Sequence, residues 1–380
     1  MSFNLIRNAR VFFSTNVNAV TGVINALGCT TSNTFEIQVL DGLSFSQNTS
    51  SETVTLSEGG NTPVRGQRSF NTALDPVDFS FSTYMRPRDG GTNITAEESV
   101  LWNAMFAVDA IGGSNPSWSE APTVATAVTI NSQKHQLQKF GLIILLDGSS
   151  YAIDNCVLDT ATVDFGLDAI ATIAWTGKGT ILRQISGLAA STGGTVTFSG
   201  ATGVLEGTAK GKNTTAPFIA NKLSTLEVTA GIDGTGTAYT IALTGGSLTI
   251  SNNVSYLTPA NLGVVNLPAT YFTGTRSITG SLTAYLRTGS TNSAGLLADM
   301  LASSSSEVDP EFLVLVAVGG ASNSVRVEFD MPACVLTIPA ISTDQVVSVN
   351  INFTAQGSTA SAFDVGAANE LEVRYYHPNT

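Results

Sequence analysis

The sequence predicts an α+β fold that is mainly β, built from two fused β-sandwich or barrel domains that are each flanked by one α-helix. Three observations support this prediction. Short segments alternate between apolar and hydroxyl side chains, which is typical of half-buried strands. Similar segments recur in the same order in both halves of the chain. A stripe of apolar residues at helical spacing follows them in each half.

The first two matched segments read as strands. Leu43–Asn48 resembles Leu248–Asn253, an offset of 248 − 43 = 205 positions. Phe81–Arg86 resembles Leu282–Arg287, where the offset is 282 − 81 = 201. The small difference between the offsets indicates only a change in loop length.

A third match lies beyond the expected helices. Cys156–Leu158 corresponds to Cys334–Leu336, and an alternating strand follows each, at Ile170–Trp175 and Val347–Phe353. Ordered matches of this kind favour an internal duplication. Chance similarity among strands rich in Ser, Thr and Val is the alternative.

One helix is expected in each half. Thr95 and Glu98 have the spacing of a capping box, and Gly112-Gly113 supplies a stop. The apolar stripe of the first helix is Val100, Leu101, Ala104, Met105 and Val108, and that of the second is Leu296, Leu297, Met300 and Leu301.

The repeat divides the 380 residues into domains. We expect a first domain over 1–185, a second over 223–370 and a C-terminal tail over 371–380. The stretch 186–222 is rich in Gly, Ser, Thr and Ala, which indicates a flexible linker. Alternation at 195–198 and 204–205 favours an inserted hairpin instead.

The composition indicates a protein that is largely covered by copies of itself. Only 12% of the residues are charged and 43% are hydrophobic, whereas a soluble monomer keeps about a quarter of its residues charged. The net charge of −12 argues against tight binding of nucleic acid, which needs clustered Lys and Arg. An acidic wall still lets DNA pass beside it.

The sequence predicts no catalytic, cofactor-binding or metal-binding residues, and therefore no enzyme. The two histidines, His135 and His377, lie far apart in the chain, and no Cys or His pair has zinc spacing. Gly177–Thr180 lacks the upstream glycine of a phosphate loop. A pair of glycosidase carboxylates cannot be judged from spacing. Four acidic residues without the pattern of a calcium loop are interpreted as solvated strand ends and turns: Asp154, Asp159, Asp164 and Asp168.

The apolar features are predicted to be core. Cys29, Cys156 and Cys334 show no CxxC spacing and are expected to be small buried hydrophobes in a reducing compartment. Leu142–Leu146 and Phe312–Val318 are too short for a membrane helix and are predicted to be buried strands. No signal peptide and no membrane contact are expected.

The duplicated segments, taken with the rest of the chain, show a resemblance to a known family. Phe3–Phe12, Asp41–Thr55, Arg65–Pro87 and Gly245–Pro259 resemble the tail tube proteins of T5-like siphophages, and Gly280–Leu286 is the most similar run. The resemblance covers nearly the whole chain in the right order.

The resemblance implies a structural virion protein made of two fused tail-tube domains. Three chains then form a homotrimeric, pseudo-hexameric ring, and rings stack into a hollow tube that holds the tape-measure protein and conducts DNA during ejection. The implied partners are further copies, the tape-measure protein, the tail terminator and the tail-tip or baseplate proteins, with DNA only in transit. The implied location is the phage tail, assembled in the host cytoplasm. Some members carry an immunoglobulin-like decoration domain at the C-terminus, and we do not expect one after Gly357.

A long loop over 57–68 is Gly-rich and carries both signs of charge. We predict an inter-subunit arm that becomes ordered on contact with an adjacent subunit or ring. A surface hairpin is the alternative. The arm residues are Glu58, Gly59, Gly60, Pro63, Arg65 and Arg68.

The hydroxyl faces of the matched strands are predicted to line the lumen. Leu43, Phe45, Phe79 and Phe81 would point into the core, as would Leu248 and Ile250 in the second half. The opposite faces offer no array of cations that would trap phosphate. The predicted lumen-facing residues are Ser44, Ser46, Ser80, Ser82, Thr249 and Ser251.

Two other classes of protein share this composition. A secreted or surface β-sandwich adhesin, or a carbohydrate-binding protein, is also acidic and rich in Ser, Thr and Gly. A carbohydrate-active enzyme with a β-sandwich would need a catalytic pair that the sequence does not reveal. Formation of tubes by the purified chain distinguishes a tail tube protein from both of these classes.

Overall fold

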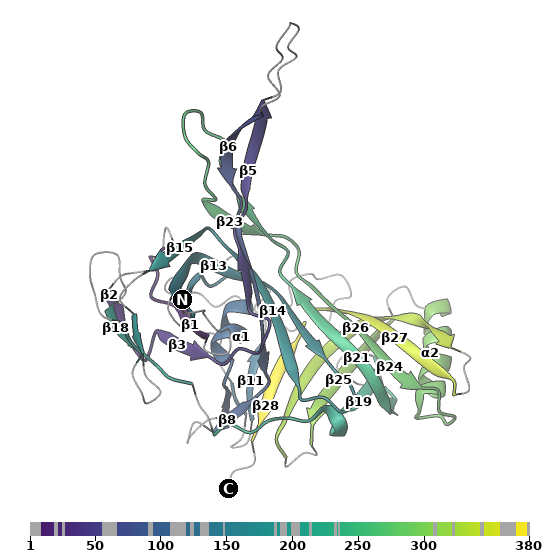
Figure 1. The fold of residues 1–380 in the computed structure, drawn as a ribbon. Helices are drawn as coiled ribbons and strands as arrows, with labels where there is room; N and C mark the ends of the chain where they lie inside the picture. Colours follow the sequence, from purple (N-terminus) through teal and green to yellow (C-terminus); the bar gives the residue numbers. More distant parts are fainter. Residues whose placement is uncertain are drawn as a thin grey trace, which may run out of the picture.

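A computed structural model gives the fold (Figure 1). It describes residues 9–18, 22–24, 27–54, 67–89, 94–106, 119–121, 125–129, 137–146, 149–185, 188–190, 196–198, 206–212, 215–231, 234, 236–306, 310–320, 324–342, 346–357 and 370–377.

One large antiparallel sheet organises the first half of the chain. Its strands are neighbours in the order β4–β7–β14–β13–β12–β1–β3. The long strand β13 belongs to two layers, because its first part pairs with β12 and its second part pairs with β14. The bounds are β1 (Arg10–Ser14), β3 (Thr34–Ile37), β4 (Ser44–Ser46), β7 (Val77–Tyr84), β12 (Phe140–Leu146), β13 (Ser149–Asp164) and β14 (Thr172–Gly179).

The second half has the same neighbour order, β21–β24–β27–β26–β25–β19–β20. The two series are joined into one sheet where β13 pairs with β21. The bounds are β19 (Thr225–Ala230), β20 (Ala238–Ile241), β21 (Leu243–Ser251), β24 (Ser277–Tyr285), β25 (Glu311–Gly319), β26 (Arg326–Ser342) and β27 (Ser348–Gln356). The buried strands predicted at 142–146 and 312–318 are confirmed as β12 and β25.

The remaining strands extend this sheet or form small ones. β15 (Ile181–Ile185) pairs with β13, and β28 (Glu372–Tyr376) pairs with β26 and with β11 (Ala125–Thr129), which in turn pairs with β10 (Ser119–Ala121). Within 186–222, β16 (Leu188–Ala190), β17 (Val196–Phe198) and β18 (Glu206–Ala209) form a small sheet with β2 (Leu27–Cys29). β8 (Pro87–Asp89) and β9 (Ile94–Ala96) form a separate pair.

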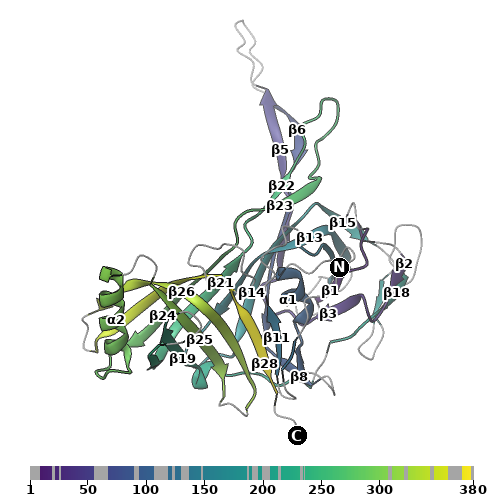
Figure 2. The same ribbon diagram turned by 180° about the vertical axis from the view of Figure 1, so that it is seen from behind.

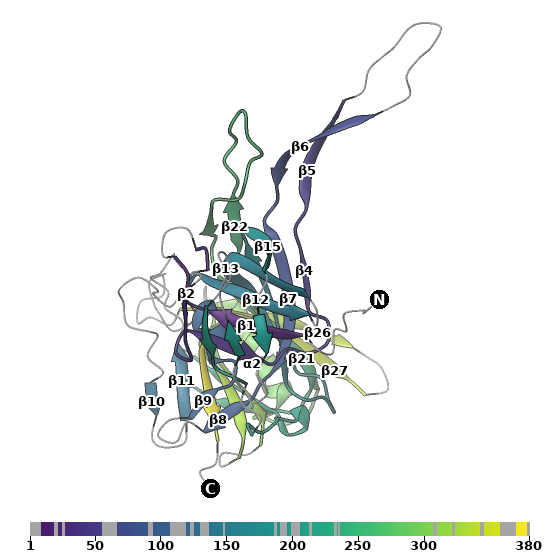
Figure 3. The same cartoon turned by 60° about the vertical axis from the view of Figure 1, so that its left-hand side comes forward.

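Two hairpins project from the same end of the body, side by side (Figures 1 and 3). The longer one is formed by β5 (Thr49–Val54) and β6 (Arg68–Leu74), and the shorter one by β22 (Val254–Leu257) and β23 (Thr270–Thr273). Each follows a corresponding strand, β4 or β21. Backbone hydrogen bonds from Leu74 to Asn266 and from Asn266 to Thr72 join them.

The described residues form one α-helix in each half, α1 (Ser99–Met105) and α2 (Ser293–Ser306), and Figure 2 shows α2 at the outer end of the second-half strands. A 3₁₀ turn, η2 (Asn221–Leu223), precedes β19. The predicted helices are confirmed, with Leu101, Ala104, Met105, Leu296 and Met300 all buried. Leu301, by contrast, is exposed. Val108 and Gly112-Gly113 lie outside the described residues.

The predicted capping box at α1 is wrong. Thr95 belongs to β9, and the side chain of Glu98, the N-cap residue, makes no capping hydrogen bond. The Glu98 carboxylate instead accepts a hydrogen bond from the Tyr375 hydroxyl on β28. A tertiary partner far away in the sequence thus replaces the local one.

Both halves contribute to one hydrophobic core. Trp102 of α1 packs edge-on against Trp175 of β14, with ring centroids 5.0 Å apart, and it also contacts Phe329 of β26. Its indole N–H donates to the Tyr375 hydroxyl at 2.7 Å. The three cysteines are free and buried, as predicted. Within the described part of the chain, no helix is long and apolar enough to cross a membrane.

Candidate functional site

All six residues predicted to line a lumen lie on one face of the large sheet. The pairing register places Ser44 opposite Ser80, and Ser251 lies farther along the same row of residues across the strands. Reading across the strands, this row is Ser44, Ser80, Thr176, Thr160, Ser251 and Ser277. We call this surface, on strands β4, β7, β14, β13, β21, β24 and β27, the hydroxyl face.

A second row lies beside the first. It consists of Ser82, Ala174, Thr162, Thr249, Thr279 and Thr354. Hydroxyl pairs within the two rows are close, with the oxygen atoms of Thr160 and Thr176 2.6 Å apart and those of Thr162 and Thr249 3.3 Å apart. Ser46 is exposed and lies opposite Asp78.

The other side of the same strands is buried, as predicted. Phe79, Phe81, Leu248 and Ile250 are all in the core, and Leu43 is at its edge. Phe45 is half-buried against the same cluster. The alternation therefore separates an apolar face from a hydroxyl face along the whole sheet.

Sequence reasoning missed the hydroxyls of β13, β14, β24 and β27. Thr160, Thr162 and Thr176 lie in the two rows, and these strands carry the same alternation as the ones selected. The other missed members of the rows are Ser277, Thr279 and Thr354. That alternation was the available signal. The missing information was the pairing of β13 with β21, which joins residues 87 positions apart, such as Thr162 and Thr249.

The hydroxyl face carries little positive charge. Among the residues of its seven strands, Lys178 is the only Lys or Arg. Its ammonium group lies 3.6 Å from the Asp78 carboxylate on the neighbouring strand. Asp164, at the end of β13, is exposed. The face therefore presents hydroxyls and carboxylates, and its one cation faces an acid.

The edges of the sheet differ between the halves. In the first half, residues 160–164 of β13 pair on one side with β14 and on the other with β21. In the second half, residues 336–342 of β26 pair with β27, and on the other side no described strand pairs with them. The edge of β4 away from β7 is similarly without a described partner strand.

The exposure of side chains follows this difference. Val163 of β13 is fully buried, whereas Ile341, which has the corresponding place on β26, is 47% exposed. Ile338 on the same strand is equally exposed. Unpaired strand edges with apolar side chains are sites at which another chain can add a strand.

Of the predicted arm, the structure describes the base. Arg68 begins β6 and is exposed, and its guanidinium lies 5.2 Å from the centre of the Phe70 ring. Glu58, Gly59, Gly60, Pro63 and Arg65 lie outside the described residues. The strands that carry this loop are almost entirely exposed along their length.

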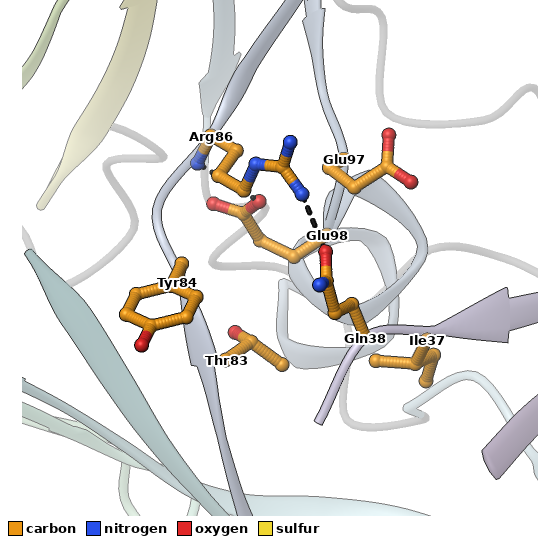
Figure 4. A pocket seen from close by; sticks show the side chains of 7 residues that line it. All are labelled: Ile37, Gln38, Thr83, Tyr84, Arg86, Glu97 and Glu98. Carbon is orange, nitrogen blue, oxygen red and sulfur yellow. Dashed lines mark hydrogen bonds between the residues drawn. The ribbon is translucent and has the colours of Figure 1, made fainter. Parts of the chain in front are cut away.

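A buried polar cluster lies at the start of α1, beside the ends of β3 and β7 (Figure 4). Desolvation raises the pKa of Glu98 to about 8. Arg86 donates to Gln38 and to the carbonyl of Ala216, and its guanidinium lies 4.4 Å from the centre of the Phe218 ring. The cavity here holds about 10 Å³, which is room for one water molecule. Through Arg86, the cluster links the start of α1 to Gln38 and to the backbone of Ala216.

One acidic residue is not solvated as predicted. Asp154 is buried in the middle of β13, where its carboxylate accepts from the Arg183 guanidinium at 2.7 Å and from the backbone N–H of Ile24 at 3.0 Å. Its partners come from other parts of the chain, which sequence spacing does not show. Among the described residues, no group of His, Cys, Asp and Glu has the arrangement of a metal site.

Comparison with known proteins identifies a relative. The chain is 31% identical to the tail tube protein pb6 of Escherichia phage T5 over an alignment of 386 residues. The alignment covers 96% of this chain and 75% of that protein. No family model matches the chain.

Proposed function

The chain belongs to the family of phage tail tube proteins, and from this premise we propose that three copies close into a ring and that rings stack into a hollow tube. The family makes it a structural protein of the virion tail that assembles with itself. The proposed tube encloses the tape-measure protein and conducts DNA during ejection, and it ends at the tail terminator and the tail-tip proteins.

The equal strand order of the two halves supports a ring of three. Seven strands follow one another as neighbours in each half, and every pairing is antiparallel. We infer that the chain is a fused pair of tube domains over 1–185 and 223–370. Three fused pairs then give six domains around the axis.

The observation that carries the proposal is the junction between β13 and β21. It joins the first domain to the second within one chain. The corresponding strands, β26 and β4, each have an edge without a described partner strand, so the same junction can form between β26 of one chain and β4 of the next. A head-to-tail contact of this kind closes into a ring when its rotation divides the circle.

The duplication also gives the register of this contact. Val163 pairs with Leu248 and Thr162 pairs with Thr249. On β26 the corresponding residues are Ile341 and Ala340. Thr162 lies opposite Ala174 on β14, and Ala340 lies opposite Asn350, which has the place of Ala174 on β27. On β4 the corresponding residues are Phe45 and Ser46, because Phe79 and Gly280 correspond by the offset of 201 and lie opposite Phe45 and Leu248. Ala340 should therefore lie opposite Ser46 of the next chain, and Ile341 opposite its Phe45.

Closing the ring buries the edges that a single chain leaves open. Each new backbone hydrogen bond contributes about 1 kcal/mol, and burial of Ile341 and Ile338 adds about 25 cal/mol for each Å² removed from water. It also extends the rows of the hydroxyl face around the axis. We propose that this face lines the lumen, because hydroxyls and a single paired lysine give phosphate no array of cations to bind.

The mass of an isolated ring tests the proposal. Native mass spectrometry of rings released from tubes by mild denaturant should show particles of three chains, and top views in electron microscopy should show threefold symmetry with six similar lobes. Rings of six chains, or tubes whose cross-section has another symmetry, would contradict it.

A further inference from the structure

An apolar loop projects from the end of the sheet. It connects β22 to β23, and from Leu257 to Thr273 it contains no charged residue. Its exposed large side chains are Leu257, Leu262, Val264, Val265, Leu267 and Phe272. Single exposed apolar residues are ordinary, but a contiguous group of this size marks an interaction surface. We call residues 257–272 the apolar loop.

The backbone of the apolar loop is held in place. Asn266 exchanges hydrogen bonds with the neighbouring hairpin, donating to Thr72 at 3.1 Å and accepting from Leu74 at 2.9 Å. Its side chain accepts from the N–H of Asn261 at 2.8 Å, and the N–H of Ala269 donates to Leu257 at 2.9 Å. A loop fixed in this way loses little conformational entropy when it binds.

A second apolar patch lies at the opposite end of the same sheet. It consists of Leu167 and Ile170, on the connection between β13 and β14, with Phe218 before η2 and Leu223 at its end. Two backbone hydrogen bonds join these segments, from Ala171 to Ile219 at 2.8 Å and from Asn221 to Ala169 at 2.9 Å. We call these four side chains the apolar patch.

The direction of β21 shows that the loop and the patch are at opposite ends. The N–H of Phe165 donates to Gly246, near the start of β21, which places the connection between β13 and β14 there. The other end of β21 leads through Ser251 into β22 and the apolar loop. The length of the strands therefore separates the two surfaces.

We propose that the apolar loop of one chain docks on the apolar patch of a chain in the next ring. This inference rests on the proposed stacking of rings. The occupant is a second copy, because translation along a tube brings one end of a subunit against the opposite end of the next, and both ends are apolar. The lateral edges of β26 and β4 are used within the ring, so these ends are left for the axial contact.

The two hairpins then have different roles. The longer hairpin of β5 and β6 carries Glu52 and Arg68 and is polar along most of its length. The apolar loop has no charge and so provides binding energy that salt does not screen. Stacking through this contact should persist at high ionic strength.

A cross-linking experiment tests the contact. A photoreactive benzophenone amino acid at Leu262 in assembled tubes should, on irradiation, be linked to peptides from 165–171 or 215–223 of another chain. The same probe in unassembled chains should give no such product. Links only to other segments of the tube would overturn the inference.

A variant tests its contribution to assembly. Leu262→Ser, Val264→Ser and Leu267→Ser combined should raise the concentration needed for tube growth by about tenfold or more, while rings of three chains still form. Leu301→Ser, at an exposed apolar position on α2, is the matched control and should leave tube growth unchanged. Normal tube growth of the triple variant would refute the axial contact, whereas failure of the parent chain to form three-chain rings would refute the proposed function instead.

Discussion

The edge of β13 and the edge of β26 are two regions with the same design and different surroundings. Both belong to a long strand that pairs first with one neighbour and then with another. In the first half β21 covers the edge, and Val163 is completely buried; in the second half Ile341 remains 47% exposed. The difference indicates that the chain satisfies one of its two junctions internally and leaves the other for a neighbouring chain.

Introduction of a charge at the two equivalent positions should separate folding from assembly. Val163→Asp places an unpaired carboxylate in the core and should reduce the free energy of unfolding by more than about 4 kcal/mol. Ile341→Asp should change it by less than about 0.5 kcal/mol and still prevent ring formation.

Urea unfolding followed by fluorescence measures the first effect, and analytical ultracentrifugation measures the second. Ile341→Val keeps the apolar edge and serves as the control. Normal rings from Ile341→Asp would show that this edge is not a contact between chains.

Deletion of residues 58–67 should have the next largest effect. The strands β5 and β6 that carry this loop are exposed, so its removal should leave the chain folded and soluble. Because the arm is predicted to become ordered on an adjacent subunit, the deleted chain should not form tubes. Electron microscopy of the purified chain measures this effect. Tubes of normal appearance from the deleted chain would exclude the arm hypothesis.

A second link between the two halves is the hydrogen bond that the Tyr375 hydroxyl on β28 donates to Glu98, the N-cap residue of α1. Because the pKa of Glu98 is raised from its usual 4.5 to about 8, the folded chain binds a proton that the unfolded chain has released in this range. The contribution of Glu98 to stability should therefore fall as pH rises from about 4.5 to about 8 and stay level above that.

Glu98→Gln mimics the protonated acid and should remove this slope from the pH dependence of the free energy of unfolding. Glu227→Gln, at an exposed position of β19, should leave the slope unchanged. An identical slope in the Glu98→Gln variant and the parent chain would mean that Glu98 is not the group responsible.

The smallest effect on the fold is expected on the hydroxyl face. Thr162→Lys removes one long hydroxyl contact with Thr249, which is worth at most about 1 kcal/mol, and tubes should form normally. The added unpaired cations should slow the passage of DNA, measured as the rate of DNA release from particles. Particles with Thr162→Ser should release DNA at the parent rate. An unchanged rate in the Lys variant would argue that this face does not line the lumen.

Local patterns predicted much of the fold. The alternation around Phe79 and Leu248 gave the correct buried and exposed faces, and the stripe containing Leu296 and Met300 gave the second helix. These features follow from the periods of strands and helices, which neighbouring residues determine.

Features that depend on distant partners were not predicted. Asp154 is buried because Arg183 and the Ile24 amide satisfy it. Glu98 does not cap its helix because its carboxylate instead accepts a hydrogen bond from Tyr375, 277 positions away. The pairing of β13 with β21 also depends on residues that are distant in the sequence. The rows of hydroxyls that make up the candidate site depend on this pairing.

The most direct test of the account is a disulfide between chains at the predicted junction. In a chain with Ser46→Cys and Ala340→Cys, oxidation of assembled tubes should produce covalent species that stop at three chains on a non-reducing gel, because the ring closes there. Ser44→Cys with Ala340→Cys, shifted by two residues along β4, should cross-link much less. A ladder that continues beyond three chains, or equal cross-linking of both pairs, would contradict a three-chain ring closed by β26 and β4 in this register.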